Sequence, residues 1–223
     1  MVMNDDQDLE QIYEVWEPQS DSAVIIFSGF GAGLMPRRTL FNYMSMMGKY
    51  NYNKIFMRDP RQVWYHWGIE GITRNVEGTA EYLTEEIAKR GITKIATLGT
   101  SGGGYAALMF GWLLSADVVH AFSPQTVLED DHPRFKVLRE DAEVCPQYFD
   151  VQPLLADPNG KTEFHIYYCV TAPRDKLQAE RLQGLPNTHL HRYEEGGHAL
   201  AAVLTRDGTL DKIIASMFDP KAG

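Results

Sequence analysis

The stretch Lys94-Ile-Ala-Thr-Leu-Gly-Thr-Ser-Gly-Gly-Gly-Tyr-Ala-Ala-Leu108 joins an apolar run typical of a strand, a glycine-rich turn and an apolar run typical of a helix. Ser101 lies at the apex of the turn, inside the pattern G-x-S-x-G that runs from Gly99 to Gly103. Between a strand and a helix, this pattern lifts a serine hydroxyl above the end of the strand. Gly99 and Gly103 carry no Cβ, so the two backbones can approach closely. The stretch therefore predicts a serine nucleophile at the carboxyl end of a strand.

The composition indicates a globular chain with one domain. The 223 residues are 44% hydrophobic and 23% charged, which is enough for one sizeable core. A net charge of −9, with no cluster of Lys and Arg, argues against nucleic-acid binding. The first ten residues are acidic and lack the apolar core of a signal peptide, and apolar runs such as 23–27 are too short to span a bilayer. We therefore expect a cytoplasmic protein with no membrane span.

Apolar β-branched runs alternate with helical patterns along the chain, which predicts a mostly parallel central sheet with helices on both faces. The expected strands are 12–16 (an edge strand), 23–27, 54–57, 92–98, 118–122, 164–170 and 189–193. The expected helices are 40–47, 75–90, 104–114, 176–182 and a last one that starts at 199–204. Residues 129–163 are polar and broken by prolines, and we expect them to form a small lid insertion within a single domain spanning 1–223.

A serine hydroxyl needs a neighbouring base, and that base needs a group that orients it. His198 follows two glycines after the last expected strand, so its imidazole can turn over the carboxyl edge of the sheet. Asp175 follows the preceding strand and is the expected acid, with Glu129 as the alternative. Read singly, each residue also has a structural interpretation: Ser101 as a turn serine, His198 as a loop histidine and Asp175 as a helix N-cap or surface residue.

On Gly99–Gly103, Asp175 and His198, taken in that order, the sequence resembles the α/β-hydrolase superfamily over roughly residues 23–204. The resemblance implies Ser101 as nucleophile, Asp175 as acid and His198 as base, with the amide of Gly102 as one oxyanion donor. The second donor would be the amide of Phe30, with Gly29 and Gly31 as alternatives. The family's common His-Gly dipeptide is Ser28-Gly29 here, and no subfamily can be assigned. The activity implied is hydrolysis of a carboxylic ester or thioester through an acyl-enzyme, on a small-molecule or carrier-linked acyl substrate and without a cofactor.

Aromatic residues follow the strand expected at 54–57, and they could wall an acyl or aryl pocket or simply pack their loop against the body. Arg37 and Arg38 could bind an anionic group or be solvated. The full set of expected pocket residues is Gly29, Met35, Trp64, Tyr65, His66 and Tyr105.

Other functions stay open at this point. The same triad could serve an acyltransferase, a lyase or a non-catalytic binding protein. Gly29-Phe-Gly-Ala-Gly33 and Asp59 superficially resemble a dinucleotide fingerprint, but Leu34 stands where that fingerprint needs its third glycine. No Cys, His and Asp cluster has metal-ligand spacing, so no metal is expected. Cys145 and Cys169 allow a disulfide without indicating one.

Overall fold

The computed structural model describes residues 11–30, 41–129, 132–157 and 160–218. In this part of the chain, seven strands form one sheet in the order β1-β3-β2-β4-β5-β6-β7. β1 pairs antiparallel with β3 at one edge, and every other pairing is parallel. The strands are β1 (Ile12–Val15), β2 (Ser22–Phe27), β3 (Asn53–Met57), β4 (Lys94–Thr100), β5 (Val118–Phe122), β6 (Glu163–Cys169) and β7 (Thr188–Tyr193).

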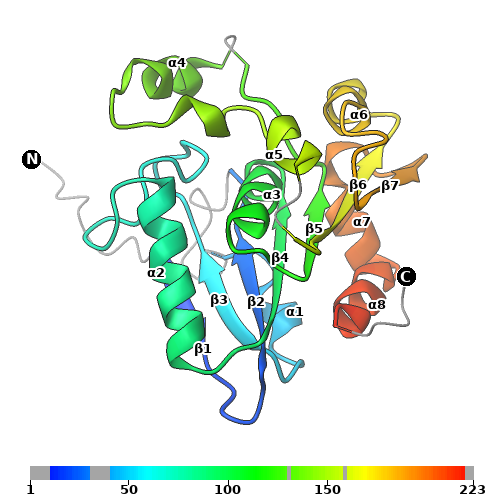
Figure 1. Ribbon diagram of the computed structural model, residues 1–223. Helices are drawn as coiled ribbons and strands as arrows, with labels where there is room; N and C mark the ends of the chain where they lie inside the picture. Colours follow the sequence, from blue (N-terminus) through cyan, green and yellow to red (C-terminus); the bar gives the residue numbers. More distant parts are fainter. Residues whose placement is uncertain (1–10, 31–40, 130–131, 158–159, 219–223) are drawn as a thin grey trace, which may run out of the picture.

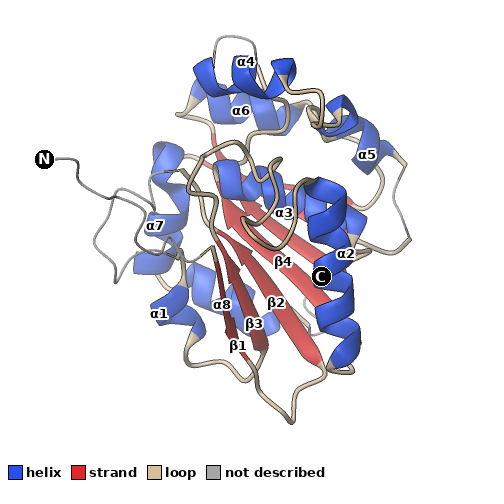
Figure 2. Cartoon of the chain, turned by 90° about the vertical axis from the view of Figure 1, so that its left-hand side faces the viewer, coloured by secondary structure: helices blue, strands red, loops and turns tan. Residues whose placement is uncertain are grey.

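Helices cover both faces of the sheet, because the central strands carry apolar side chains on both sides (Figure 1, Figure 2). One face packs against α2 and α3, and the other against α1, α7 and α8. The helices are α1 (Met44–Met47), α2 (Val76–Lys89), α3 (Gly102–Leu113), α4 (Pro133–Glu140), α5 (Gln152–Ala156), α6 (Pro173–Glu180), α7 (Leu200–Arg206) and α8 (Thr209–Ser216), with short 3-10 turns η3 (Pro146–Tyr148) and η4 (Gly197–Ala199). None of the described helices is long and apolar enough to cross a membrane.

The sequence predicts this architecture and most strands to within two residues. The expected helix over 40–47 is much shorter, since within the described residues only Met44–Met47 is helical. The helix expected at 176–182 begins earlier, at Pro173, because proline is well suited to the first turn of a helix. The described residues also contain a further helix after α7, α8, which is not among the helices expected from the sequence. Both cysteines are free thiols.

The segment expected as a lid contains α4, η3 and α5 between β5 and β6. α4 lies beyond the carboxyl ends of the strands in both views (Figure 1, Figure 2). Its buried side chains, Phe135 and Leu138, belong to the core cluster on the α2 and α3 side of the sheet. The insertion is therefore packed onto the body of the protein through apolar contacts. Whether it acts as a lid stays a prediction.

Three backbones meet at the start of α3. A Cβ on Gly99 would lie 2.0 Å from the carbonyl oxygen of Gly103, and a Cβ on Gly103 would lie 2.2 Å from that of Phe27. Both distances are far below any van der Waals contact, and backbone atoms cannot rotate away as a side chain can. The spacing between β2, β4 and α3 therefore requires glycine at both positions.

We expect Gly99→Ala to lower the free energy of unfolding by at least about 2 kcal/mol, because overpacking here pushes backbone against backbone. Gly48→Ala is the matched control, since its Cβ would meet nothing closer than 3.6 Å at a φ of −61°. Urea denaturation of both variants measures the difference. Equal stability of the two variants would contradict the close approach.

Candidate active site

Ser101 stands between β4 and α3 in a backbone conformation that few residues adopt, with φ of 54° and ψ of −124°. Its amide donates a hydrogen bond to the carbonyl oxygen of Phe122, at 2.9 Å, which ties the turn to the end of β5. A non-glycine residue at positive φ is strained and persists only where its surroundings enforce it. The glycine contacts described above and this hydrogen bond supply that enforcement. The serine side chain is consequently held at the carboxyl edge of the sheet.

His198 contacts both of the residues that the sequence analysis grouped with it. Its Nε2 lies 3.1 Å from Ser101 Oγ, and its Nδ1 lies 2.9 Å from each carboxylate oxygen of Asp175. Gly196 and Gly197, at φ of 114° and 55°, form the left-handed turn that leads into η4 and presents the imidazole. The structure thus brings Ser101, His198 and Asp175 together in one hydrogen-bonded chain.

The side chains of His198 and Asp175 differ in exposure. The His198 side chain is 59% exposed, whereas that of Asp175 is 10% exposed in the first turn of α6. A carboxylate can only accept hydrogen bonds, so Nδ1 carries the proton of the neutral imidazole, and Nε2 is free to accept one from the Ser101 hydroxyl. The hydrogen bond and the charge of Asp175 raise the pKa of His198 above the ordinary histidine value, against the opposing effect of partial burial.

The amides of Gly102 and Phe30 are the expected oxyanion donors. Gly102 is the first residue of α3, so its amide has no acceptor within the helix. Within the described residues, no hydrogen bond uses the amide of Phe30, whereas the amide of Gly29 donates to Asn42 Oδ1 at 2.8 Å. The ring of Phe30 lies on Gly102, where a Cβ would come within 2.9 Å of it. Among the described residues, the amide of Phe30 is thus unused and remains a candidate second donor, whereas the amide of Gly29 is already occupied.

A cleft of about 380 Å³ opens beside the serine. Besides Ser101, His198 and Asp175, its described lining residues are Pro124, Gln125, Ala172, Pro173, Arg174 and Gln178. They follow the carboxyl ends of β5 and β6, so the signal that could have found them is their position after a strand, as it was for Asp175. None of these six is among the pocket residues expected from the sequence.

The aromatic cluster expected as a pocket wall is instead buried beneath the site. The Tyr65 hydroxyl donates to the carbonyl oxygen of Ser28 at 2.8 Å, which joins the loop to the end of β2. The Tyr105 hydroxyl donates to the carbonyl oxygen of Tyr148, so His66 Nε2, 3.0 Å away, acts as donor to that hydroxyl. Burial lowers the pKa of His66 to about 3. Neither these residues nor Gly29 is among the described residues that line the cleft.

Asp59 organises this aromatic loop. Its carboxylate accepts hydrogen bonds from four backbone amides, those of Arg61, Gln62, Val63 and Tyr65. These contacts fold the loop back on itself and set Trp64 and Tyr65 at positive φ, 54° and 65°. Both carboxylate oxygens are occupied, which leaves Asp59 no part in a dinucleotide site.

Trp64 is buried, yet it reaches the region of the serine. Its ring lies 4.9 Å from that of Phe30 and 4.8 Å from that of His132, between ring centroids. Its indole Nε1 donates to Gln125 Oε1 at 2.5 Å. Trp64 therefore supports two residues that border the serine, Phe30 and Gln125, although it does not line the cleft itself.

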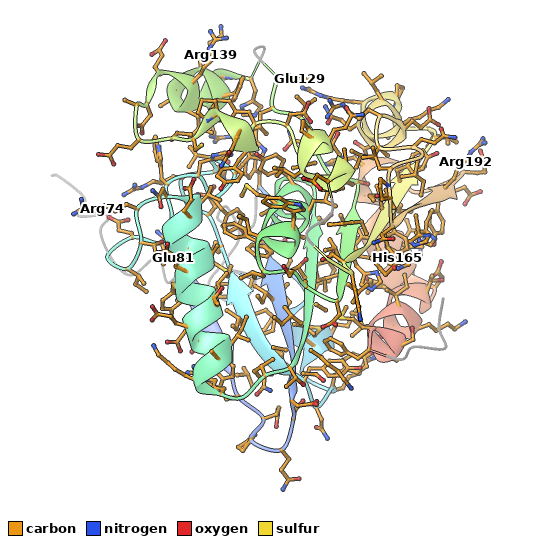
Figure 3. The ribbon with its side chains drawn as sticks, in the orientation of Figure 1. Arg74, Glu81, Glu129, Arg139, His165 and Arg192 are labelled. Carbon is orange, nitrogen blue, oxygen red and sulfur yellow. The ribbon has the colours of Figure 1, made fainter. Side chains whose placement is uncertain are left out.

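The remaining candidates lie elsewhere. Glu129, at the same end of the molecule as α4 (Figure 3), has its carboxylate 2.5 Å from Arg174 Nη2 and 3.2 Å from Gln178 Nε2, so it does not contact His198. Asp175 is thus the carboxylate in contact with the histidine. Met35, Arg37 and Arg38 lie outside the described residues. Among the described residues, no group of three or more His, Cys, Asp and Glu side chains is placed to hold a metal ion.

The fold is similar to several solved structures. The capsule O-acetyltransferase of Neisseria meningitidis serogroup A gives a TM-score of 0.67 at 18% identity, covering 93% of this chain and 93% of that one. MenH from S. aureus gives 0.62 at 15% identity, covering 94% and 100%. Naproxen esterase (carboxylesterase NP) from Bacillus subtilis gives 0.57 at 12%, covering 93% and 87%.

No protein-family model matches the sequence, and a search of the curated proteins finds no match. At these sequence identities the structural similarity shows the fold alone. The chain has the α/β-hydrolase fold, with a mostly parallel seven-stranded sheet and helices on both faces within the described residues.

We expect the imidazole of His198 to titrate above the usual histidine pKa of about 6.5. The Asp175 carboxylate stabilises the protonated ring, so Asp175→Asn should bring the pKa down. Histidine ring signals followed by NMR across a pH series measure both values. His66 is the internal control, because burial keeps it neutral and its signals should stay constant above about pH 5. A His198 pKa below 6.5, or one unmoved in Asp175→Asn, would contradict the ion-pair geometry.

Proposed function

We propose that this protein is a serine hydrolase that cleaves a carboxylic ester or thioester through an acyl-enzyme intermediate. The observation that carries the proposal is the position of His198, within hydrogen-bond reach of both the Ser101 hydroxyl and the Asp175 carboxylate. The nucleophile, the base and the group that orients the base are then all present, and in the order that also supports the α/β-hydrolase resemblance.

In the first half of the proposed reaction, His198 Nε2 takes the proton of Ser101 as Oγ bonds to the carbonyl carbon. The carbonyl oxygen becomes an oxyanion, which the amides of Gly102 and Phe30 stabilise; one such donor is worth about 3 kcal/mol. The intermediate then collapses, the bond to the leaving group breaks, and His198 returns the proton to that leaving oxygen or sulfur. The acyl group stays on Ser101.

In the second half, a water molecule gives its proton to His198 and attacks the acyl carbonyl carbon. The proton passes to Ser101 Oγ as the acid leaves. Asp175 keeps its charge throughout and stabilises the imidazolium in both halves.

Acyl transfer is the second candidate. A structure similar to this chain is that of a capsule O-acetyltransferase. The His198 side chain is 59% exposed, so an alcohol could approach the base as readily as water. An assay that adds a polyol acceptor and measures ester formed against acid released separates the two reactions.

We expect Ser101→Ala to lower kcat/KM at least about a thousandfold on a panel of p-nitrophenyl esters and acyl thioesters, because the covalent step is lost. Wild-type protein should also be labelled by a fluorophosphonate probe at Ser101. Ser45→Ala, an exposed serine in α1, is the matched control and should retain labelling and activity. Absent labelling, together with activity that survives Ser101→Ala, would refute the proposal.

The two candidate acids can be separated in the same assay. Asp175→Asn should lower kcat by about 10⁴-fold, because a neutral amide no longer holds the productive tautomer or balances the imidazolium. Glu129→Gln should cost much less, since its carboxylate pairs with Arg174 and not with His198. If Glu129→Gln lowers kcat as much as Asp175→Asn does, the assignment of Asp175 as the acid is wrong.

A further inference from the structure

The cleft lies on one side of Ser101, the side of the catalytic imidazole proposed above. Its lining includes His198 and Asp175 but neither of the residues that carry the candidate oxyanion amides, Phe30 and Gly102. In serine acyl transfer the histidine returns its proton to the leaving atom, so the leaving group must lie next to the imidazole. The cleft is therefore placed to receive the leaving group, and its volume of about 380 Å³ suits a compact one.

Most polar side chains around this cleft are already committed. Gln178 Oε1 accepts from the amides of Thr126 and Val127, and Gln178 Nε2 donates to Glu129. Arg174 pairs with Glu129. The apolar part of the wall is Pro124, Ala172 and Pro173.

Gln125 differs from these residues, because one end of its amide is fixed and the other is open. The indole Nε1 of Trp64 can only donate, so the atom it contacts must be Oε1 of Gln125 and the other end must be Nε2. Within the described residues, no hydrogen bond uses Nε2, and this nitrogen is not among the buried atoms that lack a partner. The two N–H donors of Gln125 therefore have no acceptor among the described residues, and they sit on a half-buried side chain that lines the cleft.

The backbone is strained at Trp64 and close to Gln125, the two residues joined by this hydrogen bond. Trp64 has φ of 54°, and Ser123, which leads into Pro124 and Gln125, has φ of 44°. The Ser123 amide donates to the carbonyl oxygen of Tyr167 at 2.7 Å, which holds this turn at the carboxyl edge of the sheet. Strained non-glycine residues gather at functional sites, where the surroundings hold them. Here they hold the side chain of Gln125 at the wall of the cleft.

We infer that the cleft binds the leaving group of the substrate and that Gln125 Nε2 donates a hydrogen bond to an oxygen on that leaving group. This inference rests on the proposed hydrolase function and narrows it. The favoured substrates are esters of oxygen-bearing alcohols, such as polyols, and esters of plain alkyl alcohols are poorer. Gln125 is then a residue that determines specificity, and Trp64 is a positioning residue that acts through it.

The test uses two acetate esters, 2-methoxyethyl acetate and butyl acetate. The first has an ether oxygen at the position where the second has a methylene group. The measured quantity is kcat/KM for 2-methoxyethyl acetate divided by kcat/KM for butyl acetate. Both rates are measured from the acid released. Gln125→Glu keeps an acceptor for Trp64 Nε1 but removes both donors, so the ratio should fall about three- to tenfold, the worth of one neutral hydrogen bond. Gln183→Glu, an exposed glutamine after α6, is the matched control and should leave the ratio unchanged.

A second measurement does not need turnover. Dissociation constants of both esters for Ser101→Ala and for Ser101→Ala/Gln125→Glu, measured by saturation-transfer NMR, should show the same loss of preference. If wild-type protein hydrolyses neither ester nor any other ester or thioester, the proposed function fails, and the binding data still decide the role of Gln125. If hydrolysis depends on Ser101, but Gln125→Glu changes neither the ratio of the kcat/KM values nor the ratio of the dissociation constants, the inference is overturned.

Discussion

The contact on which this structure depends is the approach of three backbones at the start of α3. A Cβ on Gly103 would stand 2.2 Å from the carbonyl oxygen of Phe27, and one on Gly29 would stand 2.6 Å from that of Thr100. The end of β2, the end of β4 and the first turn of α3 are therefore in direct contact, with no side chain between them. That contact fixes the direction in which α3 leaves the sheet, and with it the turn at Ser101. The positive φ of this serine is a consequence of the packing below it.

The same contact gives the site its electrostatics. Because α3 starts against the strand ends, its unpaired first amides lie where Ser101 Oγ stands, and a helix N-terminus carries a partial positive charge. Gly102 is at this position and has no Cβ, so the ring of Phe30 can lie directly on it. A larger residue at 102 would displace Phe30. The groups expected to stabilise a developing oxyanion thus depend on the absence of three side chains, at 99, 102 and 103.

The sequence predicts the parts of this site that depend on chain order and strand ends. Ser101, Asp175 and His198 follow separate strands, and parallel strands bring their carboxyl ends to one edge, so their meeting could be foreseen. The burial of the aromatic loop could not be foreseen, because it depends on the positive φ of Trp64 and Tyr65. No periodicity in the sequence indicates these φ values. Asp59 follows a strand in the sequence, but which amides donate hydrogen bonds to its carboxylate is decided only by the folded loop. Likewise, no pattern pairs Trp64 with Gln125, since they come from different strand ends.

The asymmetry between His198 and Asp175 limits how this site can select a substrate. The orienting carboxylate, in the first turn of α6, is 10% exposed, while the imidazole that handles the proton is 59% exposed. Among the described residues, the cleft walls come mainly from the turn after β5 and from α6 rather than from α4. An open base does not by itself discriminate between water and an alcohol, nor between one leaving group and another. Discrimination must therefore come from groups fixed rigidly beside the serine. The strained turns at Ser123 and Trp64 supply such rigidity.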